Sequence, residues 1–124
     1  MDFKVPAGFP SPAEEFASKR IDVLAKVIKH PTAAYQMVVR GESMRDAGID
    51  DGDVAIIDRG IEPRSGQIVV AVLDGEYTIK HLWQRAGRIK LKAANPTYAD
   101  IVPKDGQTIE IWGIVVATLK IHKT

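Results

Sequence analysis

The sequence predicts a mainly β fold, compact and strongly bent, preceded by one or two short helices. From Tyr35 to Leu119, short runs of β-favouring residues follow one another along the chain. Glycine, proline, asparagine and aspartate separate these runs at short intervals. Many short strands joined by frequent turns are typical of closed or strongly bent β architectures.

The amino-terminal residues 1–12 carry three prolines and show no hydrophobic period. Proline disfavours helical geometry in the residue before it, so this segment is expected to be an extended arm. The remaining residues 13–124 form a stretch long enough for one hydrophobic core but not for two. We therefore expect an arm followed by a single domain.

Two short helices are expected before residue 31. Ser11 and Pro12 are typical of a helix start, and this first helix should end near Lys19. A second helix is expected over Val23–Lys29, because Asp22 can cap its start and His30-Pro31 ends it. Its apolar stripe should pack on the core; the stripe consists of Leu24, Val27 and Ile28.

Six strands are expected in the rest of the chain, near residues 35–40, 53–58, 67–73, 76–82, 88–92 and 108–119. Asp74-Gly75 is a two-residue hairpin signal between the third and fourth of these strands. The last strand, Ile109 to Leu119, is apolar on both faces. Either a buried central position or an edge that pairs with a second copy of the chain would explain this pattern.

A turn between the first two strands contains Gly41-Glu42-Ser43-Met44, followed by the acidic stretch from Asp46 to Asp53. Glycine and aspartate favour turns, so Ser43 should lie just past a strand end with its hydroxyl accessible. Serine in a turn is common, and this position alone does not establish catalysis. The hypothesis of a catalytic serine depends on a second residue.

Lys80 lies in a predicted strand, where Glu76, Thr78 and Lys80 share one face and Tyr77 and Ile79 share the other. If Tyr77 and Ile79 pack on the core, Lys80 is either a solvated surface lysine or a lysine covered by neighbouring segments. Burial of an amine lowers its pKa, and a neutral lysine can accept a proton from serine. Ser-Lys pairs are a known variant of the catalytic triad.

Composition excludes several classes of function. The net charge of +1 provides no basic surface for sequence-specific DNA binding, and the absence of cysteine excludes disulfides and thiolate chemistry. No apolar run reaches the roughly 20 residues of a membrane helix, so no membrane association is expected. Metal binding is also not expected. The three histidines are scattered, and the carboxylates Asp50, Asp51 and Asp53 lack the pattern of a calcium loop.

Four motifs of the chain resemble those of the LexA-like self-cleaving serine peptidases. They are Gly41-Glu42-Ser43-Met44, Gly52-Asp53, Gly66-Gln67-Ile68-Val69 and Thr78-Ile79-Lys80, in the order and spacing of that family. Gly8-Phe9-Pro10-Ser11-Pro12 is similar to the start of the processed form in the UmuD-like SOS mutagenesis branch. The resemblance extends from Gly8 to the end of the chain and implies a LexA-like peptidase fold.

This resemblance implies a site and a substrate. Ser43 is expected to be the nucleophile and Lys80 the general base, with the backbone N–H groups of Glu42 and Ser43 as the oxyanion hole. The bond expected to be cut is Ala7-Gly8 of the chain itself. A small residue before this bond fits a shallow pocket, and glycine after it lets the backbones approach closely. No cofactor is implied.

The resemblance also implies partners. It predicts a cytoplasmic homodimer, stimulation of cleavage by the RecA–single-stranded DNA filament, and association with a UmuC-like subunit of an error-prone translesion polymerase. Only seven residues precede Gly8, fewer than in that branch. A second hypothesis is therefore an already processed, non-cleaving dimeric subunit of the polymerase. A LexA-type repressor fragment ranks third, because the sequence has no helix-turn-helix segment.

Overall fold

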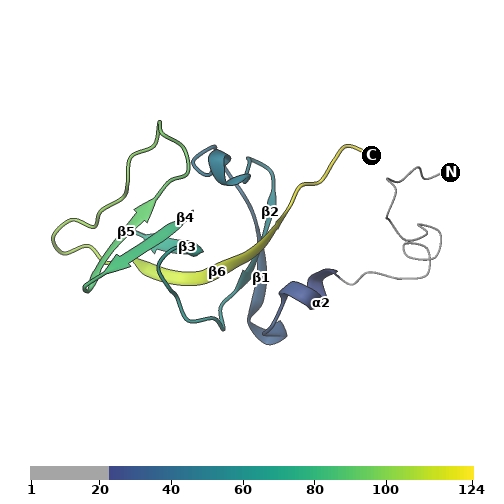
Figure 1. Ribbon diagram of the computed structural model, residues 1–124, viewed down its shortest axis with the longest axis horizontal. Helices are drawn as coiled ribbons and strands as arrows, with labels where there is room; N and C mark the ends of the chain where they lie inside the picture. Colours follow the sequence, from purple (N-terminus) through teal and green to yellow (C-terminus); the bar gives the residue numbers. More distant parts are fainter. Residues whose placement is uncertain (1–22) are drawn as a thin grey trace, which may run out of the picture.

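The computed structural model describes residues 23–124 (Figure 1). The expected arm, the expected helix from Ser11 and the Ala7-Gly8 bond lie outside these residues. One helix, six strands and two short 3-10 turns make up the described part: α2 (Val23–Val27), β1 (Ala34–Val38), β2 (Val54–Asp58), β3 (Ile68–Leu73), β4 (Glu76–Arg85), β5 (Arg88–Lys92) and β6 (Glu110–Leu119), with the turns at Pro31–Ala33 and Arg45–Ala47. All six expected strands are present, so the mainly β fold class is confirmed.

The strands form one antiparallel sheet in the order β1-β2-β6-β3-β4-β5. Strand β6 pairs with β2 through residues 114–119 and with β3 through residues 110–114. It is therefore a central strand, which explains its apolar character on both faces. The alternative of an edge strand is wrong for residues 110–114, whereas residues 115–119 pair with β2 alone within the described part of the chain.

The sheet bends around its long strand, and Figure 1 shows β6 curving between the β1-β2 pair and the β3-β4-β5 hairpins. Two register shifts accompany this bend, one between Ile56 and Ile57 on β2 and one between Val70 and Ala71 on β3. Such irregularities increase the local twist and let a strand turn a corner. They account for the strongly bent fold that the short strands predicted.

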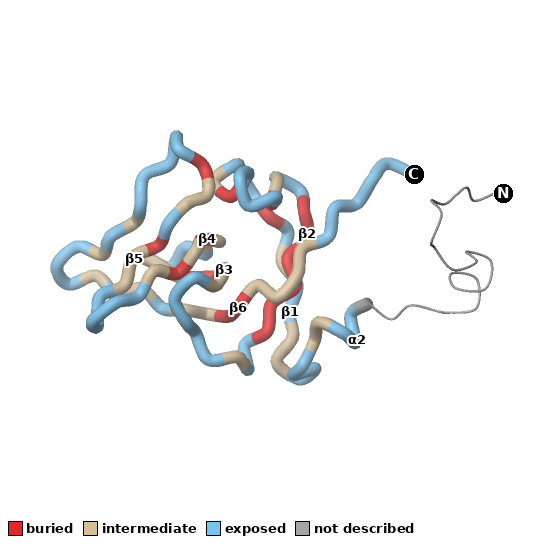
Figure 2. The backbone as a smooth tube through the Cα atoms, in the orientation of Figure 1, coloured by how far each residue is buried: buried red, intermediate tan, exposed pale blue. Residues whose placement is uncertain are grey.

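Two hydrophobic clusters form the core, one on each face of β3. Val70 belongs to the cluster that contains Met44 and Ile57, whereas Val69 and Ala71 belong to the other cluster. Successive strand residues point to opposite faces, so β3 is buried on both sides. Figure 2 shows the buried positions concentrated in the strands and exposed positions in the connections.

The hairpin between β3 and β4 is the two-residue turn that the sequence predicted. Leu73 pairs with Glu76, and Asp74 and Gly75 have φ angles of 51° and 78°. Two consecutive positive φ values fit the right-handed twist of the flanking strands, and glycine adopts them readily. Ala86 and Gly87 repeat this geometry between β4 and β5, with φ angles of 51° and 77°.

Helix α2 is shorter than expected, since it ends at Val27 rather than Lys29. Its apolar stripe was expected to pack on the core, and for Leu24 this is wrong: the residue is 42% exposed. Val27 and Ile28 are half-buried. No helix within residues 23–124 is long and apolar enough to cross a membrane.

Candidate active site

Ser43 lies in the connection between β1 and β2, as the sequence predicted. Backbone hydrogen bonds join the two ends of this connection: Val39 N–H donates to Asp53 O and Gly52 N–H donates to Val39 O, at 2.7 and 2.8 Å. Gly41 has a φ of 84°, which favours glycine, and its N–H donates to Asp51 Oδ1 at 2.7 Å. These hydrogen bonds close the base of the turn that carries Ser43.

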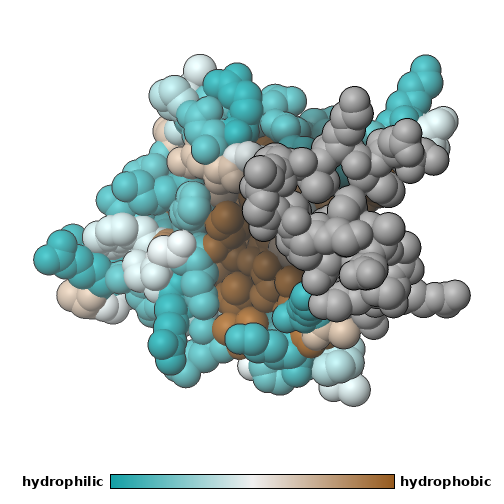
Figure 3. Space-filling model, turned by 45° about the vertical axis from the view of Figure 1, so that its right-hand side comes forward, coloured by the Kyte–Doolittle hydropathy of each residue, from teal (hydrophilic) through white to brown (hydrophobic). Residues whose placement is uncertain are grey.

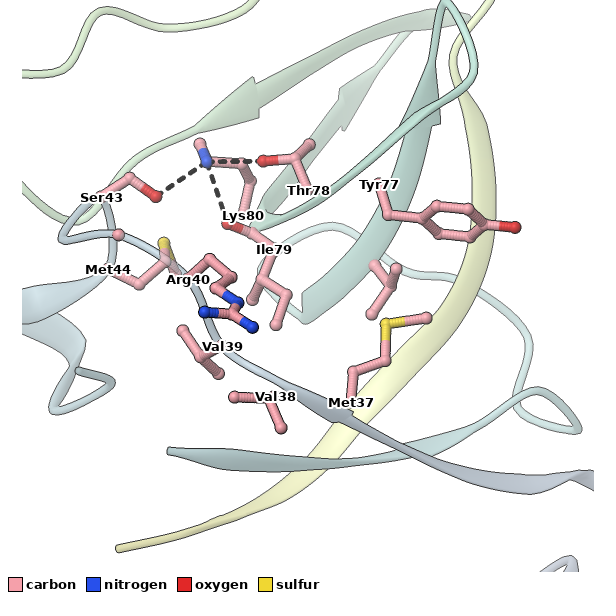
Figure 4. Close-up of a pocket in the computed structure, with 12 residues that line it drawn as sticks. Met37, Val38, Val39, Arg40, Ser43, Met44, Tyr77, Thr78, Ile79 and Lys80 are labelled. Atoms are coloured by element: carbon pink, nitrogen blue, oxygen red, sulfur yellow. Dashed lines mark hydrogen bonds between the residues drawn. The ribbon is translucent and has the colours of Figure 1, made fainter. Parts of the chain in front are cut away.

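The structure brings Lys80 to this turn. Lys80 is on β4, and its Nζ lies 2.8 Å from Ser43 Oγ (Figure 4). The residue is only 7% exposed, so it is a covered lysine and not a solvated one. The condition that Tyr77 packs on the core is not met, because Tyr77 is 56% exposed. Ile79 does pack against the core.

Two further oxygens contact the lysine amine. Nζ lies 2.7 Å from Thr78 Oγ1 and 3.1 Å from the carbonyl oxygen of Ile79. Within residues 23–124, no carboxylate forms an ion pair with Lys80. Burial without a counter-charge disfavours the ammonium form, and it lowers the pKa of Lys80 below its ordinary value.

The three contacts fit a neutral amine. A neutral Lys80 has two N–H donors and one lone pair. It can donate to Thr78 Oγ1 and to the Ile79 carbonyl while its lone pair accepts the hydroxyl proton of Ser43. In this arrangement Ser43 Oγ would be a better nucleophile, because the proton that it must lose would point at a base.

A second segment, which sequence reasoning missed, holds the turn from the other side. Ala94 N–H donates to the carbonyl of Ser43, and Asp46 N–H donates to the carbonyl of Ala94, both at 2.8 Å. The Asn95 side chain donates from Nδ2 to the carbonyl of Glu42 at 2.8 Å. Asn95-Pro96 gave only a turn signal in the sequence, and nothing local to it indicates a contact with Glu42.

The turn has bonded carbonyls and free amides. The carbonyl groups of Glu42, Ser43 and Met44 all accept hydrogen bonds. Within residues 23–124, no hydrogen bond uses the N–H groups of these same three residues. Unpaired amides beside a nucleophile can bind a developing oxyanion. The expected donors, Glu42 and Ser43, are among them.

A cleft of about 260 Å³ leads away from the Ser43-Lys80 pair. The residues that line it come mainly from β1 with its following residues and from β4: Met37, Val38, Val39, Arg40, Gly41, Ser43, Met44, Val70, Tyr77, Thr78, Ile79 and Lys80. Figure 4 shows Ser43 and Lys80 at one end and Met37 and Tyr77 at the other. An extended peptide that lay in this cleft would reach the serine from the β1 edge.

Apolar side chains are also exposed on the surface. On the face drawn in Figure 3, hydrophobic residues gather in a central area, with hydrophilic ones to its left and below it. The exposed ring of Tyr35 contacts Trp112 edge-on at 5.1 Å between centroids, and Tyr77 contacts the same indole at 5.8 Å. Trp112 therefore packs against both tyrosine rings, and it supports one wall of the cleft through Tyr77.

The acidic residues after Ser43 stabilise the turn through hydrogen bonds and ion pairs. Asp53 Oδ2 accepts from Asp50 N–H at 2.9 Å, and Lys120 Nζ contacts both Asp50 and Asp53. The hydrogen bond from Asp50 N–H lowers the pKa of Asp53 most, and the hydrogen bond from Lys120 lowers it further, so this pKa lies below its usual range. Within residues 23–124, no group of three or more histidine or acidic side chains is arranged to hold a metal ion.

The chain is similar over most of its length to known proteins of one peptidase family. Residues 1–116 match the family described as Peptidase S24-like. The chain is 39% identical to protein SamA of Salmonella typhimurium over 98% of its own length and 82% of that protein. It is 34% identical to protein MucA of Escherichia coli, over 96% and 82% of the two chains. It is also 41% identical to a LexA repressor of Paracidovorax citrulli, over 94% of this chain and 52% of that protein.

Proposed function

The chain belongs to the peptidase S24-like family, and from this we propose that it is a serine peptidase that cleaves itself with a Ser43-Lys80 pair. The observation that carries the proposal is the 2.8 Å contact between Lys80 Nζ and Ser43 Oγ. The buried position of Lys80 supports its role as a base. The family match supports peptidase activity in general, and the geometry supports this particular pair.

The proposed reaction starts with Ser43 Oγ attacking the carbonyl carbon of Ala7 while its proton passes to Lys80 Nζ. The backbone N–H groups of Glu42 and Ser43 stabilise the resulting oxyanion. One such donor is typically worth about 3–4 kcal/mol in the transition state. Lys80 then gives its proton to the amine of Gly8 as the Ala7-Gly8 bond breaks.

The product of this step is an ester between Ser43 and Ala7. Lys80 is neutral again after protonating Gly8, so it can take a proton from water. The water attacks the ester carbonyl, and Lys80 returns the proton to Ser43 Oγ as the ester bond breaks and residues 1–7 are released. The cleft between β1 and β4 supplies room for an extended segment of either the same chain or a second copy.

The test is intact mass after incubation at alkaline pH, for the wild type and for Ser43→Ala. The proposal expects the wild type to lose residues 1–7 and the variant to stay whole. If both stay whole, even with a preformed RecA–single-stranded DNA filament, the Ala7-Gly8 bond is not a substrate. The alternative of a non-cleaving dimeric binding subunit would then replace the peptidase proposal.

The biological role that we propose is SOS mutagenesis. Similarity to SamA and MucA over almost the whole chain supports this branch of the family. In this proposal, the filament favours the state in which the arm occupies the cleft, which raises the cleavage rate without adding chemistry. The processed homodimer then joins a UmuC-like subunit of a translesion polymerase. A RecA filament that left the rate unchanged would contradict the regulatory part of this proposal.

A further inference from the structure

The side chain of Asn95 is buried next to the turn that carries the nucleophile. It is 5% exposed and lies in the connection that follows β5. Its Nδ2 donates to the Glu42 carbonyl at 2.8 Å. Its Oδ1 accepts from Thr97 N–H at 3.1 Å and from Thr97 Oγ1 at 2.9 Å. Thr97 thus fixes which end of the amide faces Glu42.

The contact to Glu42 determines the direction of another group. The carbonyl of Glu42 and the N–H of Ser43 belong to one peptide unit, and no peptide bond of the described residues is cis. In a planar trans peptide, the C=O and N–H bonds point in opposite directions. A side chain that holds the Glu42 carbonyl therefore also sets the direction of the Ser43 N–H.

That N–H is free to serve as a donor. No hydrogen bond within residues 23–124 uses the Ser43 amide, while the next carbonyl along the chain, that of Ser43, is held by Ala94 N–H at 2.8 Å. Asn95 and Ala94 are consecutive and contact consecutive peptide units. The segment acts on the backbone of the turn and, within the described residues, forms no hydrogen bond with Lys80.

We propose that Asn95 is a positioning residue that aims the Ser43 N–H at the oxyanion of the self-cleavage reaction. This inference rests on the proposed function and adds a residue to it. Preorganised donors stabilise the transition state because they need no reorientation when charge develops. Without the Nδ2 donor, the Glu42 carbonyl keeps only the longer contact from Arg45 N–H at 3.2 Å, so the Glu42–Ser43 peptide unit is held less firmly. The oxyanion stabilisation then weakens, while the serine and its base stay in place.

The test compares Asn95→Asp with Thr97→Val in the full chain. Asn95→Asp keeps the size and the oxygen that accepts from Thr97, and it replaces the donor to Glu42 with an acceptor. Thr97→Val removes one hydrogen bond of the same connection but leaves the contact to Glu42. Self-cleavage is followed by intact mass from pH 7 to pH 11, and folding of each variant is checked by urea denaturation.

We expect Asn95→Asp to lower the limiting rate at high pH at least about tenfold, a part of the 10²–10³ that a lost oxyanion donor costs. The midpoint of the pH–rate profile should not move, since it reports Lys80. Thr97→Val should stay within about threefold of the wild type. A merely structural role would slow both variants in proportion to their loss of stability.

Three results would overturn the inference. They are an unchanged limiting rate in Asn95→Asp, an equal loss in Thr97→Val, and a shifted midpoint with the wild-type limiting rate. In each case the wild type still cuts itself, so the proposed function stands. A wild type that does not cut itself removes the proposed function instead, and that outcome is distinct from the other three.

Discussion

Thr78 Oγ1 lies 2.7 Å from Lys80 Nζ, two residues along the same strand. Side chains two residues apart in a strand share a face, so this contact is a direct consequence of the β4 geometry. It is shorter than the contact between Lys80 and Ser43. The threonine hydroxyl therefore fixes the direction of the amine and also stabilises its charged form, because hydrogen bonds from an ammonium are stronger than those from a neutral amine.

Thr78→Val is expected to have two effects on self-cleavage. The midpoint of the pH–rate profile should move to lower pH, because removal of the hydroxyl costs the ammonium form of Lys80 more hydrogen-bond stabilisation than it costs the neutral form. The limiting rate at high pH should fall by about tenfold, since the amine loses one of its two acceptors and its orientation. Both quantities come from cleavage rates measured by intact mass between pH 7 and pH 11.

Thr108→Val is the matched control, because Thr108 is exposed and far along the chain from the site. Its profile should coincide with that of the wild type. A midpoint that moved to higher pH in Thr78→Val would mean that the hydroxyl acts on Lys80 in some other way, and the assigned role would be wrong.

Lys80 as general base predicts a rate that rises with pH. Burial lowers its pKa, so the rise should be centred below the ordinary lysine value of about 10.4. Lys80→Arg keeps a cation, but an arginine stays protonated and cannot accept the serine proton. The variant should be inactive across the whole range, whereas the exposed control Lys92→Arg should keep the wild-type profile. A flat wild-type profile would contradict the assignment.

The same pKa shift predicts how stability depends on pH. Because folding lowers the pKa of Lys80, the unfolded chain binds more protons between the folded-state pKa and about 10.4. In this window, the free energy of unfolding of the wild type should rise with pH relative to Lys80→Met. Urea denaturation of both proteins at several pH values gives this difference, in which the other titrating groups cancel. A difference that does not change with pH would mean that Lys80 is charged in the folded protein.

Much of the fold could be predicted because its signals are local. Asp74-Gly75 and Ala86-Gly87 adopt the positive φ angles that two-residue hairpins need, and the apolar run of β3 follows from burial on both faces. The strand periodicity alone could not decide whether Lys80 is buried or exposed. The strand pattern separated Lys80 from Tyr77, but which of them is buried depends on where the β1-β2 connection lies.

The role of Asn95 could not be predicted from its local sequence. It contacts Glu42 across 53 positions of sequence, and its own neighbourhood indicates only a turn. Thr78, in contrast, was within reach of sequence reasoning, because it shares a strand face with Lys80 and carries a hydroxyl. The strand alternation places the side chains of Thr78 and Lys80 on one face. A role for Thr78 follows only from the 2.7 Å distance between its Oγ1 and Lys80 Nζ.

The carboxyl-terminal strand predicts how two copies would associate. Within the described residues, β3 pairs only with residues 110–114 of β6, so the β3-facing side of the later residues has no strand partner. Leu119 and Ile121 in this region are exposed, and an unpaired apolar edge is usually covered. We expect the wild type to be a dimer and Leu119→Asp to be a monomer by sedimentation. Val102→Asp, a charge at a more exposed apolar site, should remain dimeric; a dimeric Leu119→Asp would place the interface elsewhere.

His30 and Asp58 join the segment before β1 to the end of β2. Asp58 is fully buried; its carboxylate accepts from His30 Nδ1 at 2.9 Å and from Gly60 N–H at 2.7 Å. Burial by itself would raise the pKa of Asp58, but the hydrogen bonds from His30 and Gly60 outweigh it and hold the pKa below its usual range. The stability from this contact is therefore present above the unfolded-state pKa of about 3.9 and is lost as the pH falls through the lower folded-state value.

Gly60 leaves the space that the His30 ring occupies. A Cβ at this position would lie 2.6 Å from His30 Cγ, so Gly60→Ala must displace the ring from Asp58. At pH 7 we expect Gly60→Ala and His30→Ala each to lower the free energy of unfolding by about 1–3 kcal/mol, the usual cost of leaving a buried polar group short of a partner. In the His30→Ala background, Gly60→Ala should cost less than in the wild type, because the ring atoms are gone and the contact with Asp58 is already lost, although the Cβ of residue 30 still lies 3.0 Å from the added Cβ. Urea denaturation of the four proteins measures this coupling, and additive costs would show that Gly60 and His30 act independently.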